Sequence, residues 1–205
     1  PIALKDRTTL WNSVELNEKA SNAQLARNFI IALPKELSFE ENKRLITEFI
    51  QENFISKGMI VDLAIHDESD EENNNIHAHI MTTLRPINEK GEWQPKSKKE
   101  YILDEKGEKI KLKNGNYKTR KVELTDWNDK GNAEKWRENF ASLCNQYLEK
   151  NHQEKRVDHR SYKRQGIEEI PTIHLGASAS ALEKKGIETD KGSINREIKK
   201  HNSLV

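Results

Sequence analysis

Three histidines near the middle of the chain restrict its fold more than any other feature. His66 ends an apolar run that begins at Met59, and His77 and His79 lie two residues apart in the next run, Ile76–Arg85. Side chains alternate faces along a strand, so His77 and His79 point to the same side of a sheet. If the two runs pair as an antiparallel hairpin, His66 lies beside that pair, and three imidazoles converge on one sheet face.

Three convergent imidazoles predict a site for one divalent metal ion with an open coordination position. A single histidine at a strand end is usually only an exposed polar group, and a His-x-His pair alone leaves both interpretations open. The hairpin register that joins all three favours the metal. The intervening loop, Asp67–Asn75, holds five acidic residues and is either a solvated turn or the source of a carboxylate ligand.

Length and composition indicate one domain, or one domain with an appendage, in a chain of 205 residues. We place the core at about residues 1–150 and a basic C-terminal extension at about 151–205. The only cysteine, Cys144, excludes an internal disulfide and fits a reducing cytosol. We see no membrane span or signal peptide and expect a cytoplasmic protein. A first residue of Pro1 rather than Met indicates a fragment or processed form.

Hydrophobic periodicity, together with the residues that begin and end helices and strands, predicts an α+β fold in which helices cover an antiparallel sheet. Ser38 and Glu41 form a capping box that opens an amphipathic helix, which we end at Gly58. Between the sheet and the last long helix we expect hairpins or a long excursion over 88–127. The other predicted elements are a helix over 8–19, strands over 23–33, 59–66 and 76–85, and a helix over 133–150.

Two basic regions stand out, and such regions are either solvated surface or phosphate-binding surface. Between Lys96 and Lys121 there are ten basic and four acidic residues, and residues 151–205 hold eleven basic and eight acidic ones. The residues that we expect to bind DNA are Arg85, Lys96, Lys98, Lys99, Arg160, Tyr162 and Arg164. Trp93 is either a base-stacking residue or a buried anchor of the excursion.

Short motifs along nearly the whole chain resemble the MobA/MobL-type plasmid mobilisation relaxases, in the same order. This family belongs to the HUH endonucleases, named for a histidine-hydrophobe-histidine motif. The resemblance implies a ferredoxin-like, palm-shaped antiparallel sheet with helices on one face. The matching segments are Lys5–Asn12, Asn22–Arg27, Ile31–Pro34, Lys57–Asp62, His77–His79, Asp126–Asn128, Asp158–Tyr162, Gly166–Ile167 and Ile170–Gly176.

The resemblance also implies an activity, which is nicking and rejoining of single-stranded DNA at an origin of transfer during conjugative mobilisation. A tyrosine attacks the scissile phosphate, leaving a 5′-phosphotyrosine and a free 3′-hydroxyl. His66, His77 and His79 would hold one divalent ion, such as magnesium or manganese, which neutralises charge in the transition state. Relaxosome accessory proteins are possible further partners.

This chain departs from the family pattern in two ways. The family's nucleophilic tyrosine lies in an alanine-rich helix that we expect upstream of Pro1, so the catalytic residue is unknown here. Relatives often place a glutamate just after the Ala-Arg pair, and some place another two residues later. Those positions are Asn28 and Ile30 here, so a carboxylate that could orient a ligand histidine is absent.

Three alternatives remain open. Tyr147 and Lys150 form the Tyr-x-x-Lys string of replication-initiator nickases, but Tyr147 also lies on an apolar helix stripe with Trp136 and Phe140, which favours packing. The chain could instead be a single-stranded DNA-binding module without catalysis. It could also be a three-histidine zinc hydrolase, although no apolar pocket or acid–base partner is visible beside the histidines.

Overall fold

The computed structural model describes residues 2–67 and 75–204 of the chain. It divides into two compact units, Pro1–Val157 and Asp158–Val205. The first unit contains the sheet and the three histidines, and the second is a small helical unit.

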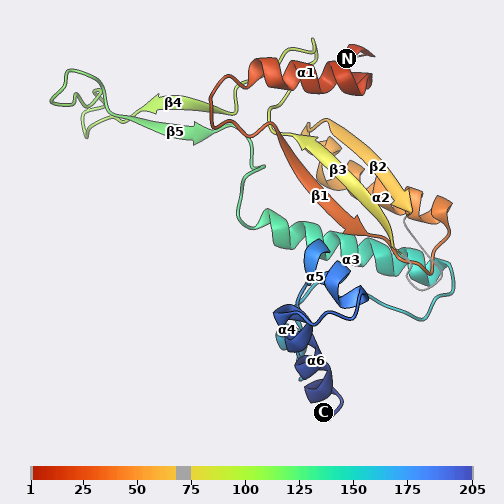
Figure 1. Cartoon of the computed structure of the whole chain (residues 1–205). Helices are drawn as coiled ribbons and strands as arrows, with labels where there is room; N and C mark the ends of the chain where they lie inside the picture. Colours follow the sequence, from red (N-terminus) through yellow and green to blue (C-terminus); the bar gives the residue numbers. More distant parts are fainter. Residues whose placement is uncertain (1, 68–74, 205) are drawn as a thin grey trace. The chain divides into compact units, whose positions relative to one another are not determined.

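A three-stranded antiparallel sheet forms the centre of the first unit (Figure 1). Its strands are β1 (Ala26–Ala32), β2 (Val61–Asp67) and β3 (Ile76–Thr83), in the order β1-β3-β2. All three strands lie where hydrophobic periodicity predicts them, and β2 and β3 form the predicted antiparallel pair. The strand that carries His77 and His79 is therefore central, and β1 and β2 are the two edges.

Two helices cover one face of this sheet and bury the core. They are α2 (Phe39–Asn53) and α3 (Asn132–Lys150). Ser38 caps α2 as predicted, because its side chain accepts a hydrogen bond from the backbone N–H of Glu41. The α-helix ends at Asn53 rather than reaching Gly58; a 3₁₀ turn, η2 (Ile55–Lys57), follows, and Gly58 closes it with a φ of 88°.

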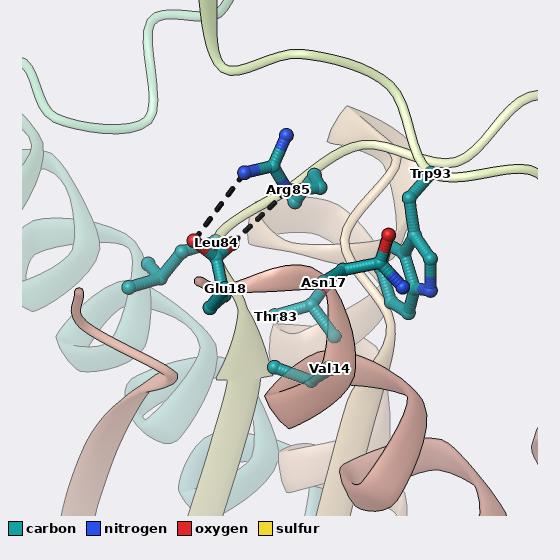
Figure 2. A pocket seen from close by; sticks show the side chains of 7 residues that line it. All are labelled: Val14, Asn17, Glu18, Thr83, Leu84, Arg85 and Trp93. Carbon is teal, nitrogen blue, oxygen red and sulfur yellow. Dashed lines mark hydrogen bonds and ion pairs between the residues drawn. The ribbon is translucent and has the colours of Figure 1, made fainter. Parts of the chain in front are cut away.

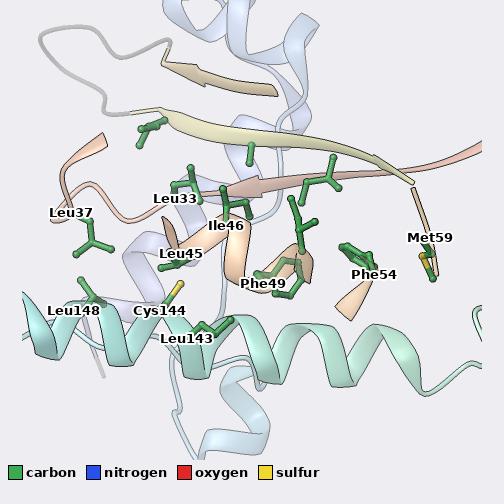
Figure 3. Close-up of a cluster of buried hydrophobic side chains, with 14 of the residues drawn as sticks. Leu33, Leu37, Leu45, Ile46, Phe49, Phe54, Met59, Leu143, Cys144 and Leu148 are labelled. Atoms are coloured by element: carbon green, nitrogen blue, oxygen red, sulfur yellow. The ribbon is translucent and has the colours of Figure 1, made fainter. Parts of the chain in front are cut away.

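The core lies between the covered sheet face and these helices (Figure 3). Along β3, Ala78 and Ile80 are fully buried, whereas the alternating His77 and His79 are only partly buried. The two faces of β3 therefore differ in burial, as strand alternation requires. The helices contribute most of the fully buried bulk, chiefly through Leu45, Ile46, Phe49, Phe54, Cys144 and Leu148.

The opposite sheet face, which we call the open face, carries the histidines. Residues paired directly across an antiparallel sheet share a face. The register therefore places these residues on the open face: Asn28, Ile30 and Ala32 of β1, Asp62, Ala64 and His66 of β2, and His77, His79 and Met81 of β3.

The N-terminal helix α1 (Arg7–Asn17) follows a short 3₁₀ turn, η1 (Ile2–Lys5), and is tied to the open face at Asp62. The Arg7 guanidinium contacts the Asp62 carboxylate at 2.6 Å, and the Trp11 indole N–H donates to the same carboxylate at 2.9 Å. Asp62 lies four residues before His66 on β2, about 13 Å along the strand. The helix is thus held at the end of the open face away from the histidines.

The predicted excursion is an exposed arm built on the hairpin β4 (Ser97–Tyr101) and β5 (Thr119–Glu123). Three similar turns shape this part of the chain, since Asn88, Asp104 and Asn114 each accept a hydrogen bond from the backbone N–H two residues later. A glycine with φ of 84° or 85° follows in each turn. None of residues 97–126 is buried, so the arm has no core of its own.

The second unit consists of the helices α4 (Tyr162–Gln165), α5 (Ala177–Lys184) and α6 (Asp190–Asn202). Two asparagines of α6 form hydrogen bonds to the backbone of an extended segment. The Asn195 side chain accepts from the Ile173 N–H and donates to the Ile173 carbonyl, and Asn202 makes the same two bonds with Ile170. Glu183 joins α5 to α6 by accepting from Thr189 and pairing with Arg196 at 2.7 Å. The hydrophobic periodicity of this region is weak, because short polar helices leave little periodic signal.

Candidate metal centre and nucleic-acid interface

The three predicted histidines meet on the open face. His66 pairs directly with His77 across β2 and β3, and His79 follows two residues along β3 on the same face. The ring centroids lie 5.6 Å apart for His66 and His77, 4.7 Å for His66 and His79, and 4.9 Å for His77 and His79. The antiparallel register, rather than a specialised loop, therefore assembles the cluster.

The geometry of the cluster suits one metal ion. One nitrogen from each ring lies within 4.8 Å of the other two. Metal–imidazole bonds of about 2.0–2.1 Å allow nitrogens on one ion to be at most about 4.2 Å apart. Closing that difference needs only small rotations of His66, which is exposed, and of His77 and His79, which are partly buried. These three side chains could therefore hold a divalent ion.

A backbone hydrogen bond fixes how His77 presents its ring. Its Nδ1 lies 2.6 Å from the carbonyl oxygen of Asn75. A carbonyl can only accept, so Nδ1 carries the proton and Nε2 is left as the ligand atom. Metal-binding histidines are commonly oriented by this kind of contact through the second ring nitrogen.

The residues beside the cluster on β1 are not acidic. Ile30 is the direct cross-strand partner of His79, and its side chain is 64% exposed. Asn28 pairs with Met81, one step further from the histidines. The acidic loop Asp67–Asn75, either a solvated turn or the source of a carboxylate ligand, lies mostly outside the described residues, at positions 68–74.

Two of the predicted DNA-binding residues, Arg85 and Lys96, form ion pairs with one buried carboxylate. Figure 2 shows the pair that Arg85 makes with Glu18. Glu18 follows α1, and its side chain is only 6% exposed. It pairs with Arg85 at 3.0 Å and with Lys96 at 2.9 Å. Burial alone would raise the pKa of Glu18, but these two cations outweigh it and leave that pKa below its usual value. Arg85 and Lys96 thus anchor the start of the arm to α1.

The other predicted lysines lie on the arm. Lys98 is exposed and pairs with Glu100 at 3.0 Å, and Lys99 is exposed on the neighbouring position of β4. The arm follows the C-terminal end of β3, whereas the histidines lie at and near the start of that strand (Figure 1). These lysines and the histidines therefore occupy opposite ends of the first unit.

Arg160, Tyr162 and Arg164 all lie in the second unit. Arg160 holds Asp158 through its guanidinium at 2.6 Å, which lowers the pKa of Asp158 to about 2. Its charge is therefore already matched by a carboxylate. Tyr162 begins α4 and is 38% exposed, and Arg164 lies two residues later on the same short helix.

Two aromatic residues have structural contacts. The Trp93 indole N–H donates to the Ser13 hydroxyl of α1 at 2.7 Å, which agrees with the anchor interpretation. Tyr147 packs against the core, and its hydroxyl donates to Glu48 at 2.7 Å. Burial, followed by the bond to Glu48, raises the pKa of Tyr147 to about 12. A hydroxyl so placed is poorly suited to act as a nucleophile.

Solved structures place this fold in a known class. The fold is similar to a chain from a structure entitled "Molecular Basis of Vancomycin Resistance Transfer in Staphylococcus aureus". The TM-score is 0.59 and the sequence identity 36%, over 78% of this chain and 69% of the other. The predicted α+β class, an antiparallel sheet with helices on one face as in HUH relaxases, is thereby confirmed.

Sequence comparison identifies the family. The model of the MobA/MobL family matches residues 1–185, and the chain belongs to this family. It is 35% identical to the "Probable mobilization protein MobA" of Bifidobacterium longum, over 100% of this chain and 38% of the relative. It is 38% identical to the "Conjugal transfer protein TraA" of Agrobacterium fabrum, over 85% of this chain and 15% of the relative. The chain thus spans well under half of these relatives.

Among the described residues, no helix is both long and apolar enough to cross a membrane.

Proposed function

We propose that this chain is part of a metal-dependent DNA relaxase, which nicks and rejoins one DNA strand at a plasmid origin of transfer. Membership of the MobA/MobL family supports a role in conjugative mobilisation. The observation that carries the proposal is the cluster of His66, His77 and His79 on an open sheet face. An uncovered face leaves room for a long polymer substrate, which a closed pocket would exclude.

Each histidine has a defined part in this proposal. His66, His77 and His79 hold one divalent ion, with magnesium and manganese the expected candidates, and their neutral side chains leave its charge undiminished. The bound ion supplies Lewis-acid stabilisation of charge that develops on a non-bridging phosphate oxygen. The contact between His77 and Asn75 keeps one ring pre-oriented for this task.

The nucleophile of the proposed reaction is a tyrosine outside these 205 residues. Tyr147 is partly buried against the core and has a pKa of about 12. Tyr101 and Tyr117 lie on the arm, and Tyr162 belongs to the second unit. An attacking tyrosine would exchange its O–H bond for a phosphotyrosine bond, and the leaving 3′-oxygen would take a proton. Retention of the phosphoester energy in that link would allow the strand to be rejoined.

The DNA path that we propose has two separate parts. Single-stranded DNA crosses the open face at the histidines, where the scissile phosphate lies. Lys98 and Lys99 on the arm contact phosphates at a distance from that point. Arg160, Tyr162 and Arg164 remain candidates for contacts made by the second unit, with stacking on bases by Tyr162. Arg85 and Lys96 also remain candidates, because together they share the single carboxylate of Glu18 and keep one net positive charge.

The proposal places the protein in the cytoplasm, with origin DNA and relaxosome accessory proteins as partners. A nicking assay tests it. The 205-residue chain and a longer protein extended upstream of Pro1 are each mixed with a labelled single-stranded origin oligonucleotide, with and without Mn²⁺, and resolved on a denaturing gel.

We expect a metal-dependent covalent adduct from the longer protein and none from the 205-residue chain. Nicking that is independent of metal would contradict the proposed centre. An adduct from the 205-residue chain that disappears in Tyr147→Phe would instead support the initiator-like mechanism.

A further inference from the structure

Ile30 is a large apolar residue that the fold leaves 64% exposed on the open face. It lies directly across from His79 on β3, and Ala64 of β2 lies across from His79 on the other side. The Cβ atoms of residues paired in this way are about 4.5–5.5 Å apart. Because the alanine side chain is a single methyl group, Ile30 is the bulky apolar neighbour of the histidine in this row.

The next row of the open face continues this surface towards α1. It consists of Asn28, Met81 and Asp62 and lies about 7 Å further along the strands. Met81, in the middle of the row, is only partly buried. Asp62, at its edge, is bound by Arg7 and Trp11 of α1. A short strip of apolar surface therefore lies between the candidate metal centre and the helix.

The charges beside this strip suit a polyanion. Asp62 is the one carboxylate that the register places on the open face within the described strands, and the Arg7 guanidinium contacts it at 2.6 Å. The Arg7 side chain is itself 63% exposed. Asn28 is exposed and neutral. A DNA strand can therefore follow this face without meeting a carboxylate that lacks a cation.

A phosphate held at His66, His77 and His79 would bring an adjoining nucleotide onto Ile30, which is the direct neighbour of His79 on β1. An aliphatic side chain offers nothing to a phosphate, but it packs well against the flat and weakly polar face of a base. Isoleucine is among the apolar residues that proteins insert against DNA bases in this way. The base, rather than the phosphate, is therefore the part of the nucleotide that suits Ile30.

We propose that Ile30, with Met81 beside it, binds the unpaired base of the nucleotide joined to the scissile phosphate. The inference rests on the proposed function and adds substrate discrimination to it. Base pairs stacked in a duplex cover the face that Ile30 needs, so this contact favours a single strand over a duplex. Ile30 has no group that can move a proton or bind a metal, so it determines specificity and takes no part in the chemistry.

Fluorescence anisotropy with two single-stranded probes tests this role without any activity assay. One probe is a short labelled oligothymidylate, and the other has the same sugar–phosphate chain but no bases. Both are titrated with the 205-residue chain in the presence of Mg²⁺. We expect Ile30→Ser to weaken binding of the oligothymidylate by about three- to tenfold and to leave binding of the abasic probe unchanged. Ile30→Val, which keeps most of the apolar surface, should restore most of the affinity.

Two outcomes would overturn the assignment. Equal losses with both probes would mean that Ile30 only holds the ring of His79 in place, and no loss with either would make it an ordinary exposed residue. Leu16→Ser is the matched control, because Leu16 is 75% exposed on α1. His79→Ala tests the proposed function separately: it should weaken both probes alike, and an unchanged affinity for both would contradict the metal centre rather than the role of Ile30.

Methyl NMR of the same chain gives a direct readout of the contact. In protein labelled at the isoleucine methyl groups, the signal that is missing from Ile30→Val identifies Ile30. We expect this signal to shift when the oligothymidylate is added in Mg²⁺, because the ring of a base placed over the methyl group changes its local magnetic field. It should move little with the abasic probe, and Ile55, which is 44% exposed beyond α2, should not respond to either. An Ile30 signal that responds equally to the two probes would contradict the proposal.

Discussion

Ile30 lies directly across the β1–β3 ladder from His79, on the open face of the sheet. A 64% exposed aliphatic residue therefore borders the candidate metal centre. The cluster relies on imidazole nitrogens alone among the residues of β1, β2 and β3 that the structure describes. A single added carboxylate should therefore raise the affinity of this site for a divalent ion.

Ile30→Glu should strengthen binding of a divalent ion. The carboxylate would lie beside His79, where it can accept an imidazole N–H or contribute charge, and outer contacts of this kind change metal affinity by about 10–100-fold. Calorimetric titration with Mn²⁺ measures the effect, and Ile30→Gln is the control of similar shape. Equal Mn²⁺ affinities for the Glu and Gln variants would show that a charge at position 30 does not affect metal binding.

Glu18→Gln should destabilise the first unit. The change leaves Arg85 and Lys96 close together without their shared carboxylate, and a lost charged hydrogen bond costs about 2 kcal/mol. The folded pKa of Glu18 is lowered, so its contribution to stability is fully present above its unfolded pKa and disappears as the pH falls through the folded value. Urea unfolding at pH 7 and at about pH 3 measures this contribution.

The difference in stability between wild type and Glu18→Gln should be large at pH 7 and small in acid. A Glu15→Gln variant on the exposed side of α1 provides the control. A difference that stays constant with pH would contradict the electrostatic role of Glu18.

Lys98→Ala combined with Lys99→Ala should weaken binding to single-stranded DNA in a salt-dependent way. Each lost phosphate contact lowers the magnitude of the slope of log affinity against log salt by about 0.7. Fluorescence anisotropy at several salt concentrations gives the slope. Lys113→Ala, at the exposed tip of the arm, is a suitable comparison. If slope and affinity both equal those of wild type, the two lysines are ordinary solvated surface.

Cys144 should not react with thiol reagents in the folded protein. Its side chain is 1% exposed, and burial raises its pKa to about 12, so almost no thiolate is available at neutral pH. Alkylation by iodoacetamide, followed by mass spectrometry, should be slow in buffer and rapid in denaturant. Rapid modification in buffer would show that the packing between α2 and α3 opens readily.

The predictions from sequence succeeded where the signal is local. The Ser38 cap depends on residues three positions apart, and the strand assignments depend on runs that alternate or stay apolar. The histidine cluster needed only one further assumption, that β2 and β3 pair as neighbours. Hairpin pairing of consecutive strands is common, so this assumption was a strong one.

Contacts between distant segments could not be predicted in this way. Glu18 meets Arg85 across 67 positions, and Arg7 meets Asp62 across 55. Both acidic residues look like ordinary surface charges in the sequence, and no periodic pattern marks their partners. The pairing of Arg85 and Lys96, which we expect to bind DNA, with Glu18 could therefore not be predicted from the sequence.

Titration of the 205-residue chain with Mn²⁺ tests the metal centre most directly. Wild type should bind one ion, and His79→Ala should lower the affinity by more than about 100-fold, since it removes a ligand rather than an outer contact. Binding should also be weaker in acid, because protons compete with the metal ion for imidazole nitrogens. His152→Ala, which lies outside the cluster, should bind as wild type does. Unchanged binding of one ion by His79→Ala would contradict the three-histidine site.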